Sequence, residues 1–226
     1  PTNGDTASVS DQGKGTYTFV MASGAVEVQI TFVPESEWSN PFSDVPADAW
    51  YFDGVRYAAE HGLMGGYSTS LFGPDDHLTR AQLVQILYTL EGRPNTENEN
   101  LGYPFADVPG DSWFADAVYW ARLHGIVSGY SAEQFGPNDS ITREQMATIL
   151  YNYAEYKGHD TSAGTDLSGY DDVGEVSSWA LTAMAWANAE GMISGTSSAA
   201  LSPRSFATRA QTALILMRYC ENIMKQ

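Results

Sequence analysis

The chain has 226 residues, of which 43% are hydrophobic, enough to bury a sizeable core in one or two domains. Its 28 acidic residues outnumber 11 Lys and Arg residues, so the net charge is −17. This charge argues against nucleic acid as a partner and against broad electrostatic attachment to an anionic membrane. An anionic ligand would therefore have to bind locally, through a few placed cations.

Cysteine and histidine usage gives no sign of a metal or a cofactor. Cys220 is the only cysteine, so no disulfide forms within the chain and no Cys-rich zinc site is expected. The four histidines are not paired at ligand spacing, and no EF-hand spacing occurs. The sequence contains no run of about 18 apolar residues, so we expect no membrane insertion. We expect a monomeric fragment of a longer exported protein whose signal lies upstream.

Residues 1–40 differ in composition from the rest. Residues 1–15 are rich in Gly, Ser, Thr and Asp, which is typical of a linker. Residues 16–21 and 26–33 are β-branched and apolar, and residues 22–25 between them suit a turn, which predicts a β-hairpin. Because a lone hairpin is marginal in water, we expect it to pack on the following repeats or to be the remnant of a preceding β domain.

From residue 41 onward one unit occurs three times, at 41–95, 104–158 and 168–226. Each unit opens with an aromatic residue, a spacer and Asp-Val, and a tryptophan follows. The aspartates are Asp44, Asp107 and Asp172, and the tryptophans are Trp50, Trp113 and Trp179. A first helix is expected after each tryptophan. It should end at the glycine 12 residues further on, which is Gly62, Gly125 or Gly191.

The middle of each unit contains two turns. The first holds Gly66, Gly129 or Gly195, which indicates positive φ or the close approach of another group. The second reads Phe-Gly-Pro in the first two units and Leu201-Ser202-Pro203 in the third.

A second helix opens each time with Thr-Arg-x-Gln, where Thr and Gln form a capping box. Its apolar stripe includes Leu214, Leu216 and Met217 in the third unit. Two helices are too few to bury such a stripe, so the three units should pack around a shared core.

The arginine of that motif is unusual for its place. Arg80, Arg143 and Arg209 each fall at the first position of a helix, where the partial positive charge favours anions instead. We expect each arginine to meet an anion, helped by the free N–H groups of the helix start. The residues favour an internal salt bridge to the repeat aspartates over a ligand carboxylate or phosphate, and the two can coexist.

The tryptophans also allow two interpretations. A Trp face stacks on sugar rings, but a repeated Trp is more often a core residue. Arg, Asp, Trp and a Gly turn in one unit would suit an acidic sugar. No catalytic motif is present: there is no Gly-x-Ser-x-Gly, phosphate loop or Cys/His dyad, so we expect no catalytic residues and no enzyme.

The order of these motifs, ending in Thr-Arg-x-Gln, resembles the S-layer homology repeat, over about residues 41–220. The resemblance implies a mainly α, pseudo-threefold helical bundle with grooves between adjacent repeats. Such grooves bind secondary cell-wall polysaccharide, often through a pyruvylated amino sugar, and hold exported proteins on Gram-positive-type cell walls. In the family, the motif arginine, aspartate, tryptophan and turn glycine contribute to the groove. Here these are Arg80, Arg143, Arg209, Asp44, Asp107, Asp172, Trp50, Trp113, Trp179, Gly66, Gly129 and Gly195.

Two departures from the family pattern bear on function. The family motif commonly ends in Glu, whereas Gln82, Gln145 and Gln211 keep the cap without the charge. The third unit diverges most, with Thr196 in place of Tyr, so we expect the groove built mainly from this unit to be the weakest or purely structural. Among the motif arginines we expect Arg209 to be the structural one. The expected function is non-covalent anchoring at the cell surface through wall polysaccharide. The alternative is a structural or protein-interaction domain in which the Arg/Asp pairs are internal salt bridges.

Overall fold

The structure is a computed structural model that describes residues 9–11, 17–19, 38–95 and 105–224. Two short strands, β1 (Val9–Asp11) and β2 (Tyr17–Phe19), pair antiparallel, with Val9 opposite Phe19. β2 lies in the first strand expected from sequence, whereas residues 22–33, which hold the expected turn and second strand, lie outside the described residues. β1 lies in the stretch expected to be a linker, so that interpretation was wrong for Val9–Asp11.

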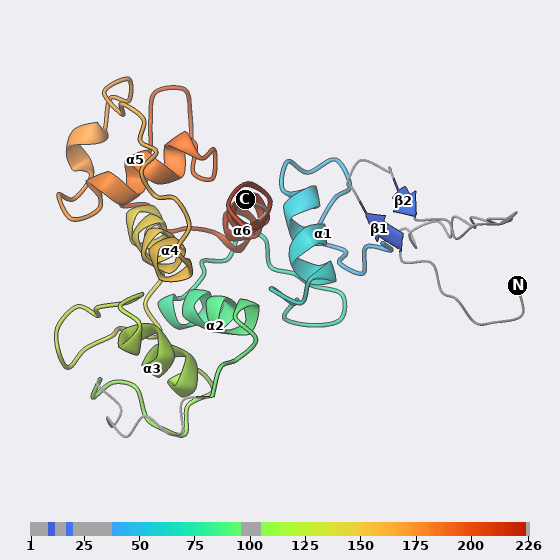
Figure 1. Cartoon of the computed structure of the whole chain (residues 1–226), viewed down its shortest axis with the longest axis horizontal. Helices are drawn as coiled ribbons and strands as arrows, with labels where there is room; N and C mark the ends of the chain where they lie inside the picture. The colour runs from blue at the N-terminus through green and yellow to red at the C-terminus, as the bar shows by residue number, and fades with distance from the viewer. Residues whose placement is uncertain (1–8, 12–16, 20–37, 96–104, 225–226) are drawn as a thin grey trace, which may run out of the picture. The chain divides into compact units, whose positions relative to one another are not determined.

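The helical part consists of three helix pairs, one from each repeat (Figure 1). The first helices are α1 (Phe52–Glu60), α3 (Ala115–Leu123) and α5 (Leu181–Ala189). The second helices are α2 (Arg80–Leu90), α4 (Arg143–Lys157) and α6 (Arg209–Asn222). A short 3-10 helix, η1 (Val173–Glu175), forms where the third unit carries one extra residue before its tryptophan. The expected mainly α fold is confirmed.

Local sequence accounts for both ends of these helices. Each second helix begins with a complete capping box, in which the threonine side chain accepts the N–H of the glutamine and the glutamine side chain accepts the N–H of the threonine. Each first helix is followed by Gly62, Gly125 or Gly191 with φ of 64°, 73° and 68°, the left-handed conformation that glycine adopts readily. Both expectations are confirmed.

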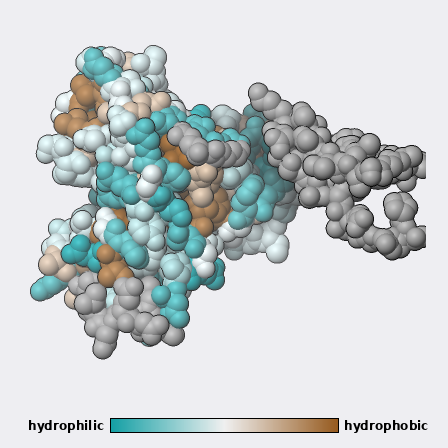
Figure 2. All heavy atoms as spheres, viewed as in Figure 1, coloured by the Kyte–Doolittle hydropathy of each residue, from teal (hydrophilic) through white to brown (hydrophobic). Residues whose placement is uncertain are grey.

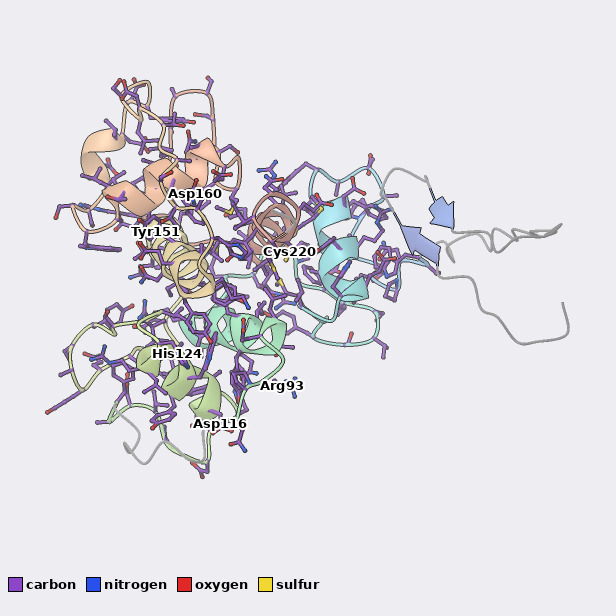
Figure 3. The ribbon with its side chains drawn as sticks, viewed as in Figure 1. Arg93, Asp116, His124, Tyr151, Asp160 and Cys220 are labelled. Carbon is purple, nitrogen blue, oxygen red and sulfur yellow. The ribbon has the colours of Figure 1, made fainter. Side chains whose placement is uncertain are left out.

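Each second helix packs against the first helix of the next repeat: α2 against α3, α4 against α5, and α6 against α1. Figure 1 shows α2, α4 and α6 at the centre, with α1, α3 and α5 outside them. In Figure 3, Tyr151 lies between α4 and α5, and Cys220 lies on α6 beside α1. Since α1 belongs to the first repeat and α6 to the last, the repeats close into a ring.

A cycle of backbone hydrogen bonds joins the three repeats before their second helices. The N–H of Leu78 donates to Ala207 O, Ala207 N–H to Ile141 O, and Ile141 N–H to Leu78 O, at 2.9–3.0 Å. The core lies between the helix pairs and includes Trp120, Trp186, Phe72, Phe105 and Phe135, all fully buried. Burial of each such side chain contributes about 1.5–3 kcal/mol. Figure 2 shows hydrophobic residues in separate patches on an otherwise hydrophilic face.

Candidate functional site

In the described part of the chain, three equivalent grooves lie between the repeats, and each groove combines parts of all three repeats. Groove A contains Arg143 of the second repeat, the turn 192–196 and helix α6 of the third, and Trp50 of the first. Groove B contains Arg80 of the first repeat, the turn 126–130 and α4 of the second, and Trp179 of the third. Groove C contains Arg209, residues 63–65 with α2, and Trp113. Their volumes are about 450, 410 and 160 Å³.

The three motif arginines are buried, with only 4–5% of their surfaces exposed. Each Nε donates 2.9 Å across to a backbone carbonyl of the next repeat: Arg80 to Phe135, Arg143 to Leu201 and Arg209 to Phe72. Arg143 and Arg209 also donate from Nη2 to Ser194 O and Gly65 O, at 2.6 Å. Burial lowers the pKa of each arginine, but an arginine stays charged at neutral pH. The cations therefore hold neighbouring repeats together at the edge of each groove.

The repeat aspartates bind backbone N–H groups of their own unit. Asp44 accepts Phe72 N–H and Gly73 N–H, both at 2.8 Å, and the bonds of Asp107 and Asp172 are equivalent. Burial alone raises the pKa of Asp44, but these N–H bonds and the charge of Arg209 give a net lowering. The pKa of Asp172 is lowered in the same way, with Arg143 as the nearby charge.

The expected internal salt bridges do not form. Among the described residues, the ion pairs within 4.0 Å are Arg56–Asp53 and Lys157–Glu91, so no motif arginine directly contacts a repeat aspartate. Instead, Arg209 and Asp44 bind the two sides of one residue, Phe72. The partner of each motif arginine is a backbone carbonyl in the neighbouring repeat. The sequence had led us to expect a carboxylate in this place.

The N–H groups at the helix starts are also occupied. Arg80 N–H donates to Asp139 O and Ala81 N–H to Pro137 O, both at 3.0 Å, and α4 and α6 are held likewise. The expectation that these groups would help bind a ligand anion was wrong, because the turn of the neighbouring repeat reaches them first.

Aromatic rings cover two of the three arginines. The guanidinium carbon of Arg80 lies 4.5 Å from the ring centre of Tyr130, and that of Arg209 lies 4.5 Å from Tyr67. The place of these tyrosines in the third unit is taken by Thr196, which bonds Ser202 Oγ at 2.6 Å. The divergence of the third unit thus leaves Arg143 without a tyrosine ring over its guanidinium, although it is buried as fully as Arg80 and Arg209.

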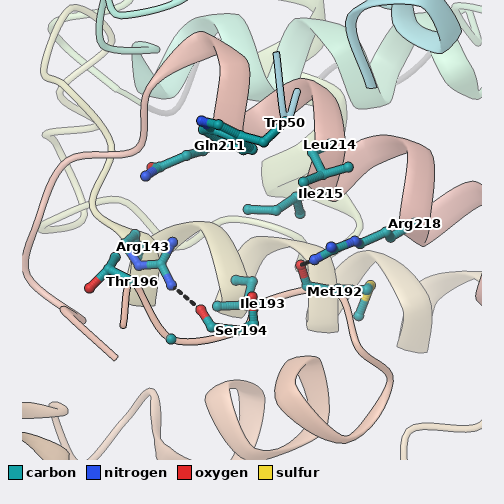
Figure 4. A pocket seen from close by; sticks show the side chains of 11 residues that line it. Trp50, Arg143, Met192, Ile193, Ser194, Thr196, Gln211, Leu214, Ile215 and Arg218 are labelled. Carbon is teal, nitrogen blue, oxygen red and sulfur yellow. Dashed lines mark hydrogen bonds between the residues drawn. The ribbon is translucent and has the colours of Figure 1, made fainter. Parts of the chain in front are cut away.

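The repeat tryptophans are exposed, not buried as expected for core residues. Trp50, Trp113 and Trp179 are 62%, 63% and 55% exposed, and each lines a groove. In Figure 4, Trp50 lies above groove A, with Arg143 and Arg218 on opposite sides below it. Exposed Trp faces are available for stacking on a flat or ring-shaped ligand.

The turn glycines are tightly packed. Gly195 and Gly129 line grooves A and B, whereas groove C is lined by Gly65, the residue before Gly66. A Cβ at Gly66, Gly129 or Gly195 would lie within 3.0 Å of the opening aromatic residue of its unit and of turn carbonyls. Gly129 also has a φ of 74°. The expectation of close approach is confirmed for all three, and that of positive φ for Gly129 alone.

Sequence reasoning missed the helix face that lines each groove. In groove A this face is Gln211, Leu214, Ile215 and Arg218, and in groove B it is Gln145, Thr148, Ile149 and Asn152. Their spacing of three and four residues marks one helix face that starts at the motif glutamine, which was a usable signal. Leu214, expected in the buried stripe, lines the groove instead.

The groove linings are free of negative charge. None of the described residues that line grooves A, B and C is Asp or Glu, although the chain has 28 such residues. Each groove combines an acid-free lining, an arginine, backbone and amide polar groups, and an exposed tryptophan. This arrangement suits a ligand that carries an anionic group beside a sugar-like ring. None of the helices in the described part of the chain is long and apolar enough to cross a membrane.

Fold and grooves together define an all-helical, pseudo-threefold repeat domain. The sequence matches the S-layer homology domain at residues 41–84, 104–147 and 169–213, and the chain belongs to this family.

Surface proteins and enzymes both occur among the relatives. The chain is 31% identical over 176 residues to an endoglucanase of Bacillus sp. (strain KSM-635), covering 78% of the chain and 18% of that protein. It is 29% identical over 165 residues to the S-layer protein sap of Bacillus anthracis, covering 73% and 19%. It is 28% identical over 185 residues to a cellulosome-anchoring protein of Acetivibrio thermocellus, covering 80% and 39%. The chain thus matches a minor part of each relative's length.

Proposed function

We propose that this domain anchors an exported protein at the cell surface by binding secondary cell-wall polysaccharide in the inter-repeat grooves. An acidic sugar, of the pyruvylated amino-sugar class, would place its carboxylate beside the motif arginine and its ring against the tryptophan. The domain itself would act in binding and not in catalysis. Relatives named as S-layer and cellulosome-anchoring proteins support the anchoring role, and relatives named as enzymes fit a domain that accompanies varied partners.

One observation carries the proposal: each groove has an arginine and an exposed tryptophan in an acid-free lining, in a chain of net charge −17. A domain with purely structural arginines has no need to expose three equivalent tryptophans. Nor would it need to keep carboxylates away from three equivalent grooves.

The exposed tryptophans provide a cleaner test than the arginines, because removal of a buried arginine would also weaken the fold. Trp50→Ala with Trp179→Ala alters grooves A and B and leaves the helices intact. We expect grooves A and B of this double variant each to lose about two- to tenfold in affinity for purified wall polysaccharide, since each aromatic contact is worth about 0.5–1.5 kcal/mol. The readout is co-sedimentation, with circular dichroism to confirm the fold.

Trp113→Ala is the matched control, because Trp113 is equally exposed but lies in the smallest groove. We expect it to bind nearly as well as the unaltered chain. Unchanged binding by the double variant would instead favour a structural or protein-interaction role for the grooves.

A further inference from the structure

The grooves differ in charge at one helix position. Seven residues after the motif glutamine stand Arg218 in the third repeat, Asn152 in the second and Thr89 in the first. Arg218 lines groove A and Asn152 lines groove B. Groove A therefore contains two arginines, Arg143 and Arg218, whereas groove B contains one, Arg80.

The charge of Arg218 is not required for its contact with the turn. Arg218 Nη1 donates to Met192 O at 3.4 Å, near the upper limit for a hydrogen bond. In groove B, Asn152 Nδ2 donates to the equivalent carbonyl, Ile126 O, at 3.1 Å. An uncharged amide thus makes the same bond at a shorter distance. A guanidinium has five N–H donors, which leaves most of Arg218 available to a ligand.

Arg143, the other cation of groove A, is as buried as its equivalents but lacks the tyrosine ring that lies over each of them. Tyr130 lies over Arg80 and Tyr67 over Arg209, but the corresponding residue beside Arg143 is Thr196. Within the described part of the chain, neither Arg143 nor Arg218 forms an ion pair within 4.0 Å. Groove A therefore has two cations and no carboxylate in its lining, and the charge that acts on Arg143 comes from Asp172, outside the lining.

Both cations donate hydrogen bonds to backbone carbonyls of the same turn, residues 192–196. Arg143 bonds Ser194 O and Arg218 bonds Met192 O, on residues two apart. Two residues span at most about 7 Å, so the two carbonyls lie within about that distance. Arg143 and Arg218, which bond them, are therefore close enough to bind one ligand of one or two sugar rings. Figure 4 shows them on opposite sides of the groove, with Ile193 and Ile215 between them.

We propose that groove A recognises a glycan segment carrying two negative charges, one at Arg143 and one at Arg218, whereas groove B recognises a single charge. Arg218 is the residue that sets this charge preference. The inference rests on the proposed glycan-binding function and specifies its ligand.

Two probes separate this inference from the proposed function. One is an amino sugar with a single pyruvate ketal, which has one carboxylate. The other is a disaccharide of that sugar with a hexuronic acid, which has two. Binding is measured by titration calorimetry on the whole chain carrying Trp113→Ala and Trp179→Ala, so that groove A dominates.

Arg218→Asn is the matched variant, because it introduces the residue that groove B uses for the same backbone bond. We expect the parent to bind the doubly charged probe about tenfold more tightly than the singly charged one. Arg218→Asn should remove this preference, because it lowers affinity for the doubly charged probe about tenfold more than for the singly charged one. In a Trp50→Ala, Trp113→Ala background, Asn152→Arg should create the preference in groove B.

Equal affinity of the parent for the two probes would overturn the inference and leave the proposed function standing. So would a preference that survives Arg218→Asn. Failure of both probes to bind the unaltered chain would overturn the proposed function for this glycan class, and the inference with it.

Discussion

Asp44 and Arg209 hold opposite sides of the same residue in the folded chain. Asp44 Oδ1 accepts the N–H of Phe72 at 2.8 Å, and Arg209 Nε donates to the carbonyl of Phe72 at 2.9 Å. The two charged residues come from the first and last repeats, 165 positions apart in sequence. The buried backbone of Phe72 thus connects a carboxylate and a guanidinium that do not form an ion pair.

Loss of Arg209 should therefore weaken the fold before it affects a ligand. Arg209→Gln would leave the carbonyls of Phe72 and Gly65 without their partner, and we expect the free energy of unfolding to fall by about 3 kcal/mol. Urea denaturation measures this change. Arg56→Gln, which removes an exposed arginine that pairs with Asp53 at 3.4 Å, is the control and should change it by less than about 0.5 kcal/mol.

Acid should weaken the fold through the repeat aspartates. The pKa of Asp44 lies below its ordinary value of 3.8 in the fold, so its contribution is complete above the unfolded value and is lost as pH falls through the folded one. We expect stability to drop below about pH 4. Asp44→Asn should lower stability at neutral pH, on the order of 1 kcal/mol. It should also reduce the loss of stability that occurs as the pH falls.

Thermal unfolding from pH 7 to pH 2.5 tests that expectation. Asp48→Asn removes an exposed carboxylate from the same loop and serves as the control. If the melting temperature fell by the same amount at low pH in Asp44→Asn and in the unaltered chain, the role given to Asp44 would be contradicted.

Gly129 should not tolerate a side chain. Its φ of 74° disfavours L residues, and a Cβ there would meet the ring of Phe105. We expect Gly129→Ala to cost about 1–3 kcal/mol of stability and to reduce ligand binding at groove B. Gly164→Ala is the comparison, because a Cβ at Gly164 meets nothing within 4 Å. Equal melting temperatures for the two variants would rule out this packing argument.

Thr196 and Ser202 should behave as a coupled pair. In the first two repeats, the ring of Tyr67 or Tyr130 occupies the space where a Cβ on Gly73 or Gly136 would lie. Thr196→Tyr alone should therefore clash with Ser202, whereas Thr196→Tyr with Ser202→Gly should fold normally and place a ring over Arg143. A double-mutant cycle by chemical denaturation should give a coupling energy of about 1 kcal/mol or more. Additive effects would exclude the clash.

A negative charge at the motif glutamine should weaken anion binding without loss of the cap. Gln211 lines groove A while its Oε1 accepts Thr208 N–H, and Glu can make the same capping bond. We expect Gln211→Glu to reduce affinity for acidic polysaccharide about two- to tenfold, most strongly at low salt. Gln82→Glu in groove C is the matched control. Affinity that rises with Gln211→Glu would argue against an anionic ligand.

Sequence reasoning succeeded where the causes are local. The capping box of Thr79 and Gln82 closes within four residues, and Gly62 ends a helix through its own φ, so both could be predicted. The family resemblance and the mainly α fold followed from these repeated local signals.

It failed where the partner comes from another repeat. The carbonyl that binds Arg80 belongs to Phe135, 55 positions away, and no periodicity marks it. Trp50 and Trp120 are both tryptophans in or next to a first helix. Trp50 nevertheless lines a groove, whereas Trp120 is fully buried. The difference depends on which helix of a neighbouring repeat lies beside each ring, which is information outside the unit itself.

Because the repeats close into a ring, every groove depends on all three repeats. Each groove takes its arginine, turn and tryptophan from three different repeats, and α1 finds its packing partner in α6, the last helix of the chain. A cut that removes the third repeat would therefore disable all three grooves at once and leave α1 without support. Under the proposed function, loss of the third repeat would therefore end binding altogether instead of reducing it by a third.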